Sequence, residues 1–231
     1  MKGVIMRKII SFFILIVLIV TSLSACSSSE ENKRPANGMI MIGDEQFTLP
    51  IFERYKENIE EKEVFEVKTG IFGENKVLII DESTARAMIK DRILRKNDMN
   101  NRYGYTSIKK LPEIPKGASL LFAHEEEKHI TSIDLNSKEI PVSYDSDAWI
   151  GNSRDYKSQR YLIVAKKDVY RKIKADETKL QIIHFKKLLG YERPKMSTDN
   201  TLITEYLKIK RQVKDFHKLI SVKFVTFEDE G

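Results

Sequence analysis

Short apolar runs recur along the chain and predict β-strands, because each run is bounded by Gly, Pro, Asn or Asp. The predicted strands are Met39–Ile42, Val64–Lys68, Val77–Ile80, Ser119–Ala123, Ile130–Leu135 and Tyr161–Ala165. Two helical patterns interrupt them. Pro50–Glu61 has proline in its first turn, and Ser83–Lys96 brings four apolar residues near one side, at Ala87, Ile89, Ile93 and Leu94. This order favours an α+β fold, with a mixed or antiparallel sheet packed by helices.

The clearest periodicity lies near the C-terminus and predicts one long amphipathic helix that begins near Asp199, with Thr198 or Asp199 as its N-cap. Its apolar stripe steps by four, three, four, three and four residues, through Leu202, Tyr206, Ile209, Val213, Phe216 and Ile220. The opposite side carries four basic residues, Lys208, Arg211, Lys214 and Lys218. We expect the stripe to pack on the protein's own sheet rather than in a coiled coil, because it covers fewer than three heptads. Val222–Phe227 then turns strand-like.

The N-terminus has the profile of a signal peptide. Lys2, Arg7 and Lys8 precede an apolar run over Ile9–Val20 that only Ser11 interrupts. As a helix this run would cover about 18 Å, against about 30 Å for the hydrocarbon core of a bilayer. A permanent transmembrane helix is therefore disfavoured.

The apolar run closes on Leu23-Ser24-Ala25-Cys26, and here the chain resembles the bacterial lipoprotein family, whose lipobox ends in an invariant cysteine. The resemblance covers residues 1–26. It implies that lipoprotein-processing enzymes cleave between Ala25 and Cys26. It also implies that Cys26 carries a diacylglyceryl group, with acyl chains such as palmitate, that anchors the protein to the outer face of the cytoplasmic membrane. The alternative is an ordinary secretory signal with a chance cysteine at its end.

The rest of the chain is predicted to be a lipidated flexible tether over 26–37 and a single α+β extracytoplasmic domain over 38–231, after a signal peptide over 1–25. The tether prediction rests on the polar stretch Ser27–Asn37. A domain boundary within 112–156 remains open. Since Cys26 is the one cysteine of the chain, the domain needs an ordinary core rather than disulfides. Frequent Lys, Ile and Asn indicate an AT-rich genome and favour a Gram-positive source.

His124-Glu125-Glu126-Glu127-Lys128-His129 is close to a zinc-protease motif, but its spacing is wrong. The two histidines are five residues apart instead of four, which would turn them away from each other on a helix. If the flanking apolar runs are strands, the segment is a charged hairpin connection. We therefore predict no metal site here.

The stretch Asp145-Ser146-Asp147-Ala148-Trp149 begins like a calcium loop, with acids at the first and third positions. Trp149 and Ile150 then stand where an oxygen ligand and a glycine are needed. Two interpretations of the single tryptophan remain. Trp149 with Asp145 and Asp147 could form a ligand loop, for example a sugar platform, or Trp149 could fill the core, which the sequence favours.

No nucleophile motif and no glycine-rich phosphate loop is present, and the sequence predicts no cofactor. His184 and His217 stand alone on basic segments, which favours packing or surface roles.

The formal net charge is +6, and basic residues outnumber acidic ones more than twofold over 157–223. A basic block near a membrane would attract anionic lipid or a wall polymer, although it could also be plain solvated surface. Nucleic acid is excluded as a partner by export.

The sequence thus predicts a membrane-anchored lipoprotein that acts as a non-enzymatic accessory or binding protein of the cell envelope. Its partner would be anionic lipid, a wall polymer or an envelope protein. The alternative is an envelope hydrolase with an unrecognised, metal-assisted site, for which the candidate residues are His124, Glu125, His129, Asp145 and Asp147.

Overall fold

The computed structural model describes residues 35–101, 104–154, 159–190 and 201–227, and residues 33–231 form one compact unit. Its strands are β1 (Ala36–Gly43), β2 (Ile59–Phe72), β3 (Asn75–Asp81), β4 (Leu94–Asn97), β5 (Tyr105–Ser107), β6 (Ser119–Phe122), β7 (Ser132–Leu135), β8 (Lys138–Ser146), β9 (Ala148–Ile150), β10 (Tyr161–Ala165), β11 (Asp176–Leu189) and β12 (Ile220–Val225). Its helices are α2 (Glu45–Tyr55), α3 (Glu82–Lys90), α4 (Lys167–Lys172), α5 (Thr201–Gln212) and α6 (Phe216–Leu219), with 3-10 turns η2 (Lys56–Asn58) and η3 (Glu125–Glu127).

The predicted signal peptide, with Ala25 and Cys26, lies outside the described residues, as does most of the predicted tether. The tether prediction extended too far at its end, because Ala36 and Asn37 already belong to β1. In the part of the chain that the structure describes, no helix is long and apolar enough to cross a membrane.

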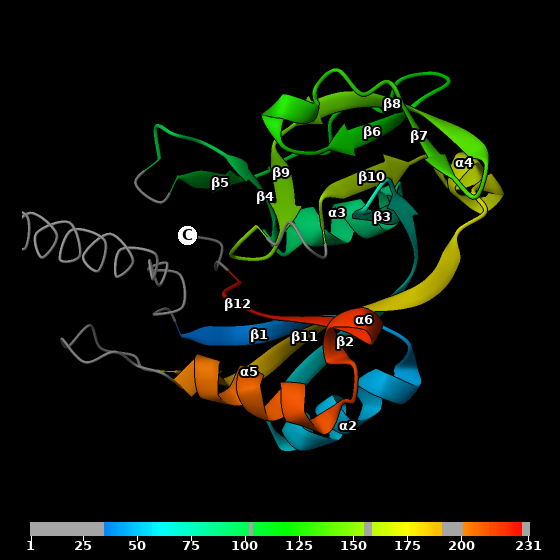
Figure 1. Cartoon of the computed structure of the whole chain (residues 1–231). Coiled ribbons are helices and arrows are strands. Elements are labelled where there is room, and N and C mark those ends of the chain that lie inside the picture. The colour runs from blue at the N-terminus through cyan, green and yellow to red at the C-terminus, as the bar shows by residue number, and fades with distance from the viewer. Residues whose placement is uncertain (1–34, 102–103, 155–158, 191–200, 228–231) are drawn as a thin grey trace, which may run out of the picture. The chain divides into compact units, whose positions relative to one another are not determined.

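The described strands form a nine-stranded sheet in the order β12-β1-β11-β2-β3-β10-β6-β8-β7 and a smaller sheet in the order β5-β4-β9 (Figure 1). β3 pairs with β10, and β6 pairs with β8, in parallel, whereas the neighbouring pairs are antiparallel. The predicted α+β class with a mixed sheet is therefore confirmed. Each of the six predicted strands is present, although β2 is much longer than predicted.

The central strands are buried on both faces, which explains why their apolar residues run without alternation. On β1, Met39 and Met41 pack against α2, α5, α6 and β12, while Ile40 and Ile42 pack into a second cluster on the other face. The helices α2, α5 and α6 thus cover one face of β1, β11 and β12 (Figure 1). A third cluster fills the space beside β3, β6, β7, β8 and β10. The compact unit therefore has the apolar core that a domain needs to fold independently.

β11 is a 14-residue strand that the sequence analysis did not predict. It pairs with β1 on one side and with β2 on the other. Gln181 and His184 interrupt its apolar centre, and lysines flank it, so neither the period-2 pattern nor a continuous apolar run is visible. Gln181 is nevertheless buried, because its amide donates a hydrogen bond of 2.7 Å to the hydroxyl of Thr48 on α2.

The sheet curves so that β7, at one edge, comes back against β2. A Cβ atom added to Gly70 of β2 would lie 2.9 Å from a methyl carbon of Leu135 on β7. Real Cβ contacts are not that short, so glycine at position 70 permits this approach.

The predicted helix over Ser83–Lys96 is wrong at its end, because α3 stops at Lys90. Arg92 has a φ of 55°, in the left-handed region, and its N–H donates to the carbonyl of Ile89. The N–H of Ile93 donates to the carbonyl of Met88. These two bonds form a Schellman motif, in which the apolar residue after the turn packs on the last helical turn. Ile93 is buried for that reason, and Leu94 begins β4.

The predicted helix over Pro50–Glu61 is also wrong in its bounds. α2 begins five residues earlier, at Glu45, where the carbonyl of Asp44 accepts hydrogen bonds from Phe47 and Thr48. Pro50 therefore lies inside the helix, where its missing N–H costs one backbone bond. The helix ends at Tyr55 because β2 begins at Ile59, which pairs with Phe185 of β11.

The predicted long C-terminal helix is divided into α5 and α6. Asp215, between them, has a φ of 56° in the left-handed region, which an α-helix does not contain. The last residue of the predicted stripe belongs to a strand instead of the helix, because Ile220 begins β12 and pairs with Gly43. The stripe still marks the buried side, since its last four residues are buried: Ile209, Val213, Phe216 and Ile220.

The beginning and the end of the described domain are tied together. The side-chain amide of Asn37 donates to the carbonyl of Phe227 at 3.0 Å, and the N–H of Phe227 donates to the side-chain oxygen of Asn37 at 2.6 Å. The hydroxyl of Thr226 donates to the carbonyl of Pro35 at 2.9 Å. The chain therefore enters β1 and leaves β12 at one place.

Candidate functional site

The acidic turn that contains His124 and His129 joins β6 to β7, but it is not a hairpin connection. β8 lies between these strands, pairing in parallel with β6 and antiparallel with β7. Within the turn, residues 125–127 form the short 3-10 helix η3. His124 begins that helix, and its Nδ1 accepts the N–H of Glu126 at 3.4 Å. The sequence pattern does not reveal the inserted strand, because β8 follows β7 in the chain.

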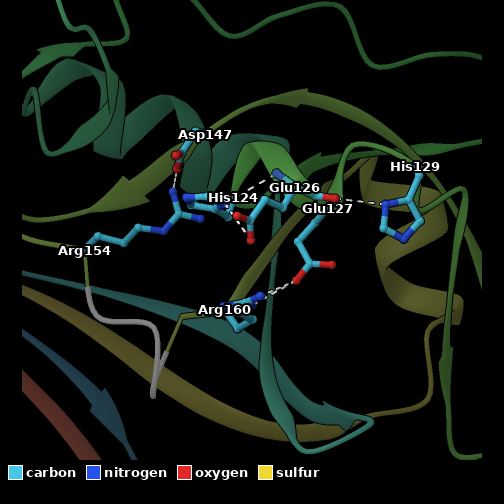
Figure 2. A network of polar contacts seen from close by, with 7 residues as sticks. All are labelled: His124, Glu126, Glu127, His129, Asp147, Arg154 and Arg160. Atoms are coloured by element: carbon cyan, nitrogen blue, oxygen red, sulfur yellow. Dashed lines mark hydrogen bonds and ion pairs between the residues drawn. The ribbon is translucent and has the colours of Figure 1, made fainter.

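The two histidines of the turn make separate, local contacts and point apart (Figure 2). Nδ1 of His129 lies 2.9 Å from the carbonyl oxygen of Glu126. Nδ1 of His124 lies 3.5 Å from the carboxylate of Glu126. Among the described residues, no group of three His, Cys, Asp or Glu side chains is arranged to hold a metal ion.

Two arginine–carboxylate ion pairs lie in and beside the turn (Figure 2). Arg160, just before β10, pairs with Glu127, and its Nε donates to that carboxylate at 3.1 Å. Arg154 pairs with Asp147, between β8 and β9, and both side chains are largely buried. The hydrogen bond to Glu127 raises the pKa of Arg160 above its ordinary value. Such pairs hold connecting segments against the sheet, and no local sequence pattern indicates that these partners meet.

The predicted ligand loop is mostly strand. Asp145 lies at an exposed position of β8, Asp147 follows that strand, and Trp149 lies on β9. The side chain of Trp149 is 8% exposed, and its ring contacts Tyr105 edge-on at 6.1 Å. The structure therefore places the tryptophan in the core rather than on an exposed platform.

His184 lies half-buried on β11, where it contacts two groups from distant parts of the chain. Its Nε2 lies 3.6 Å from the carboxylate of Asp91, and its ring stacks on Phe227 at 4.0 Å. The interaction with the Asp91 carboxylate raises the pKa of His184 above its ordinary value. This is a packing role with an ion pair. His217 lies in α6, but its side chain is outside what the structure describes.

Four basic residues that were predicted to share one side of the C-terminal helix are together called the basic face. Lys208 and Arg211 lie on α5, Lys214 lies between the two helices, and Lys218 lies on α6. All four are exposed. Two large apolar side chains of α5 are exposed as well, Ile203 by 40% and Leu207 by 44%. α5 therefore presents both positive charge and apolar surface to its surroundings.

Glu205 fixes α5 to α2. Its carboxylate accepts hydrogen bonds from the Tyr55 hydroxyl at 2.8 Å, from Arg54 at 3.0 Å and from Lys208 at 2.7 Å. Burial alone would raise the pKa of Glu205, but the hydrogen bonds from Lys208, Tyr55 and Arg54 outweigh it and lower the pKa to about 2.

Glu205→Gln is expected to lower the free energy of unfolding by about 2 kcal/mol at pH 7. A carboxylate with a depressed pKa stabilises the fold above its ordinary pKa of 4.5, and this contribution is lost as the pH falls towards 2. Denaturant unfolding at pH 7, 5 and 3 should therefore show that the difference in free energy of unfolding between wild type and the variant becomes smaller as the pH falls. Glu53→Gln, at an exposed ion pair with Lys56, is the control and should change little. A difference that stays constant down to pH 3 would contradict this role of the charge.

A protein-family model described as an uncharacterised lipoprotein family matches residues 36–223. The crystal structure of a Bacillus anthracis protein described as a lipoprotein is similar, with a TM-score of 0.61 and 28% identity over 84% of this chain and 100% of that chain. Oligomeric Cmr4 from Pyrococcus furiosus matches 82% of this chain and 99% of its own with a TM-score of 0.36 and 12% identity, which is too weak to support an argument. No curated protein matches the chain. Because the family model covers most of the sequence, the chain belongs to this lipoprotein family.

Proposed function

We propose that the protein is a non-enzymatic accessory lipoprotein, anchored through lipid on Cys26 to the outer face of the cytoplasmic membrane of a Gram-positive cell, and that its basic face binds anionic lipid headgroups. The observation that carries the proposal is the exposure of the basic face beside Ile203 and Leu207. Family membership supports the lipid anchor, and the residues Leu23-Ser24-Ala25-Cys26 support its position.

The combination of charge and apolar surface favours a lipid interface over a soluble polyanion. One side of α5 carries Ile203, Leu207 and Arg211, because these residues are spaced by four along the helix. A helix with basic and apolar side chains on its exposed surface can lie in the plane of an interface, with the apolar groups at the boundary of headgroups and acyl chains. A dissolved polymer would use only the charges.

The proposed anchor would keep the domain near such an interface. Ten positions separate Cys26 from Ala36, where β1 begins. Even a fully extended chain of that length spans at most about 35 Å. The domain would therefore meet the membrane surface at a high effective concentration, so a weak contact is sufficient.

The expected strength of the contact follows from its charges. Each basic residue near an anionic leaflet contributes on the order of 1 kcal/mol, so the basic face would contribute about 4 kcal/mol. This attraction decays over a Debye length of about 8 to 10 Å at physiological ionic strength. Binding is therefore expected to weaken steeply as salt is added.

The alternative hydrolase would need an acid, a base or metal ligands that converge on one point. In the described part of the chain, Glu127 contacts Arg160 and Asp147 contacts Arg154. His129 contacts a backbone carbonyl. These contacts favour a structural role for the turn, and for this reason the accessory function is preferred.

Replacing all four residues of the basic face with Gln is expected to reduce vesicle binding at least tenfold. The test is flotation of residues 33–231 with vesicles of phosphatidylglycerol and phosphatidylcholine, at low and at physiological salt. The matched control replaces Lys166, Lys167, Arg171 and Lys172, which are exposed residues of and beside α4 with the same total charge. This control should bind like wild type. Because Lys208 also contacts Glu205, the melting point of each variant is measured alongside.

Three outcomes would contradict the proposal. They are no binding of wild type at low salt, equal binding by the four-Gln variant, and equal loss in the α4 control. Binding to a teichoic-acid polymer but not to vesicles would assign the basic face to the cell wall instead of the membrane.

A further inference from the structure

A cavity of about 420 Å³ opens beside the small sheet. Its lining comes from β4, β5, the segment that follows β5, and β8. Binding sites for small molecules have volumes of about 300 to 1,000 Å³. The cavity therefore has the size of a site for a small ligand, and its described lining includes no residue of the basic face.

The lining of this cavity carries more positive than negative charge. Lys96, Lys109 and Lys110 supply three ammonium groups, and Asp145 supplies a carboxylate, so two positive charges are in excess. A cleft that is lined mainly by one sign of charge concentrates the electrostatic field and attracts ions of the opposite sign. The cavity therefore favours an anion over a cation.

The charges of the three lysines are not neutralised by other side chains. In the part of the chain that the structure describes, Lys96, Lys109 and Lys110 make no ion pair and no hydrogen bond. Asp145 interacts with its own neighbour instead, because its carboxylate accepts the hydroxyl of Ser146 at 2.7 Å. The three ammonium groups can therefore all turn to a bound anion.

The lining also supplies a hydroxyl group beside Lys96. Lys96 of β4 pairs directly with Thr106 of β5, so the two side chains lie on the same face of the small sheet (Figure 1). The hydroxyl of Ser107 already donates to the carbonyl of Arg92 at 3.0 Å. The hydroxyl of Thr106 makes no hydrogen bond to any described residue. Thr106 can therefore donate to an oxygen of the anion.

The backbone of the two consecutive lysines is held in place by buried neighbours. Ile108 and Leu111, on either side of them, are 6% and 7% exposed and belong to one core cluster. The N–H of Ile108 also donates to the carbonyl of Leu94 at 2.9 Å. The side chains of Lys109 and Lys110 therefore start from a fixed position at the cavity, and folding has already brought the like charges together.

The excess charge selects among anions. A phosphate group with one organic substituent or none carries a charge of about −1.5 to −2 near neutral pH, which matches the excess. A compact ammonium group binds phosphate as a point charge. A carboxylate or a phosphodiester brings a single negative charge and would leave part of the excess unmatched.

We infer that this cavity binds a phosphate dianion, either free or as a small phosphomonoester. Lys96, Lys109 and Lys110 would contact its oxygen atoms, Thr106 would donate a hydrogen bond, and Asp145 would weaken binding by repulsion. The inference is independent of the proposed membrane contact, since it needs neither vesicles nor the lipid anchor.

The test is calorimetric titration of residues 33–231 at pH 8 and low salt with inorganic phosphate, glycerol 3-phosphate and dimethyl phosphate. The first two are dianions, and the tighter of them identifies the ligand as free phosphate or as an ester. Dimethyl phosphate keeps the phosphate group but has a single charge. It is expected to bind at least tenfold more weakly than the tighter dianion.

Replacing Lys109 and Lys110 together with Gln should weaken binding of the tighter dianion at least tenfold. The matched control replaces Lys90 and Lys116 with Gln, because these lysines are exposed, lie outside the cavity lining and remove the same total charge. The control should bind like wild type. Since all four positions are exposed, the folds should stay intact, and thermal unfolding without ligand verifies this.

Two further variants should change the affinity in opposite directions. Thr106→Val keeps the shape of the side chain but removes the hydroxyl, so it should weaken binding at least threefold. Asp145→Asn removes the repulsion and can still accept the hydroxyl of Ser146, so it should strengthen binding at least twofold. A site that held its ligand by contacts with Asp145 would show the reverse.

The inference is overturned if neither dianion binds at millimolar concentration, or if dimethyl phosphate binds as tightly as both. It is also overturned if the Lys109 and Lys110 variant binds like wild type, or if the Lys90 and Lys116 control loses as much affinity. In the last case the anion would respond to the net charge of the domain and not to this cavity.

Discussion

Cys26→Ser is expected to abolish lipid attachment and to leave the signal peptide uncleaved by the lipoprotein peptidase. Attachment needs a thiolate nucleophile, and Cys26 is the one cysteine of the chain, so no other residue can replace it. A single acyl chain binds a membrane only marginally, whereas the two chains of a diacylglyceryl group hold firmly. The variant should therefore lose both its label and its stable lipid anchor. Metabolic labelling with a fatty acid, followed by mass measurement of the protein, tests both outcomes.

Ser27→Ala is the matched control for this experiment, because it changes the neighbouring residue and keeps the thiol. It should be labelled and cleaved like wild type. Equal labelling of wild type and Cys26→Ser, or cleavage at another position in wild type, would remove the lipid anchor from the proposed function.

Phe216→Asp is expected to unfold the domain. Phe216 is 4% exposed, its ring lies 5.6 Å from that of Tyr206, and it packs in the cluster that covers one face of β1. Loss of a buried phenylalanine side chain costs about 3 to 5 kcal/mol. A buried charge without a partner adds several kcal/mol. The sum reaches the whole stability of a typical domain, which is about 5 to 15 kcal/mol.

Lys214→Asp tests whether the effect comes from burial, since Lys214 is two residues away and exposed. This control should remain folded and shift the melting point little. Phe216→Leu keeps an apolar side chain and should fall between the two. Circular dichroism and limited proteolysis distinguish the variants. If Phe216→Asp melts within a few degrees of wild type, the packing described for α6 is wrong.

The sequence predicted strands better than helices because the central strands are buried on both faces and read as plain apolar runs. Val77–Ile80 and Tyr161–Ala165 were found with nearly correct ends. The end of a helix depends on backbone conformations that an apolar pattern does not reveal. Arg92 and Asp215 adopt left-handed φ angles without being glycine, so neither stop was visible in the sequence. Ile220 fits both a helical stripe and a strand, and its pairing with Gly43 decides the outcome.

The candidate sites depended even more on partners far apart in the sequence. The spacing of His124 and His129 could be judged within one short segment. The contact of Glu127 with Arg160 spans 33 residues, and no local pattern indicates it. A cavity of about 430 Å³ at the ends of β1 and β2 and the starts of β3, β11 and β12 is a stronger case, because its lining joins residues from Ile42 to Ser221. Ile71 and Leu219 have no common period with Asp44, so only the sheet order could bring them together.

The bonds between Asn37 and Phe227 also determine how mechanical load would enter the domain. Any pull transmitted through the residues before Pro35 reaches β1 at its N-terminal end. β1 is paired with β11 on one side and β12 on the other, and the hydrogen bonds of antiparallel strands run perpendicular to the strand axis. A pull along β1 therefore loads two ladders in shear at the same time, and the Asn37–Phe227 bonds share the load at the point of entry. If the proposed anchor holds the domain at this strand, the rate at which the domain unfolds governs its survival under force.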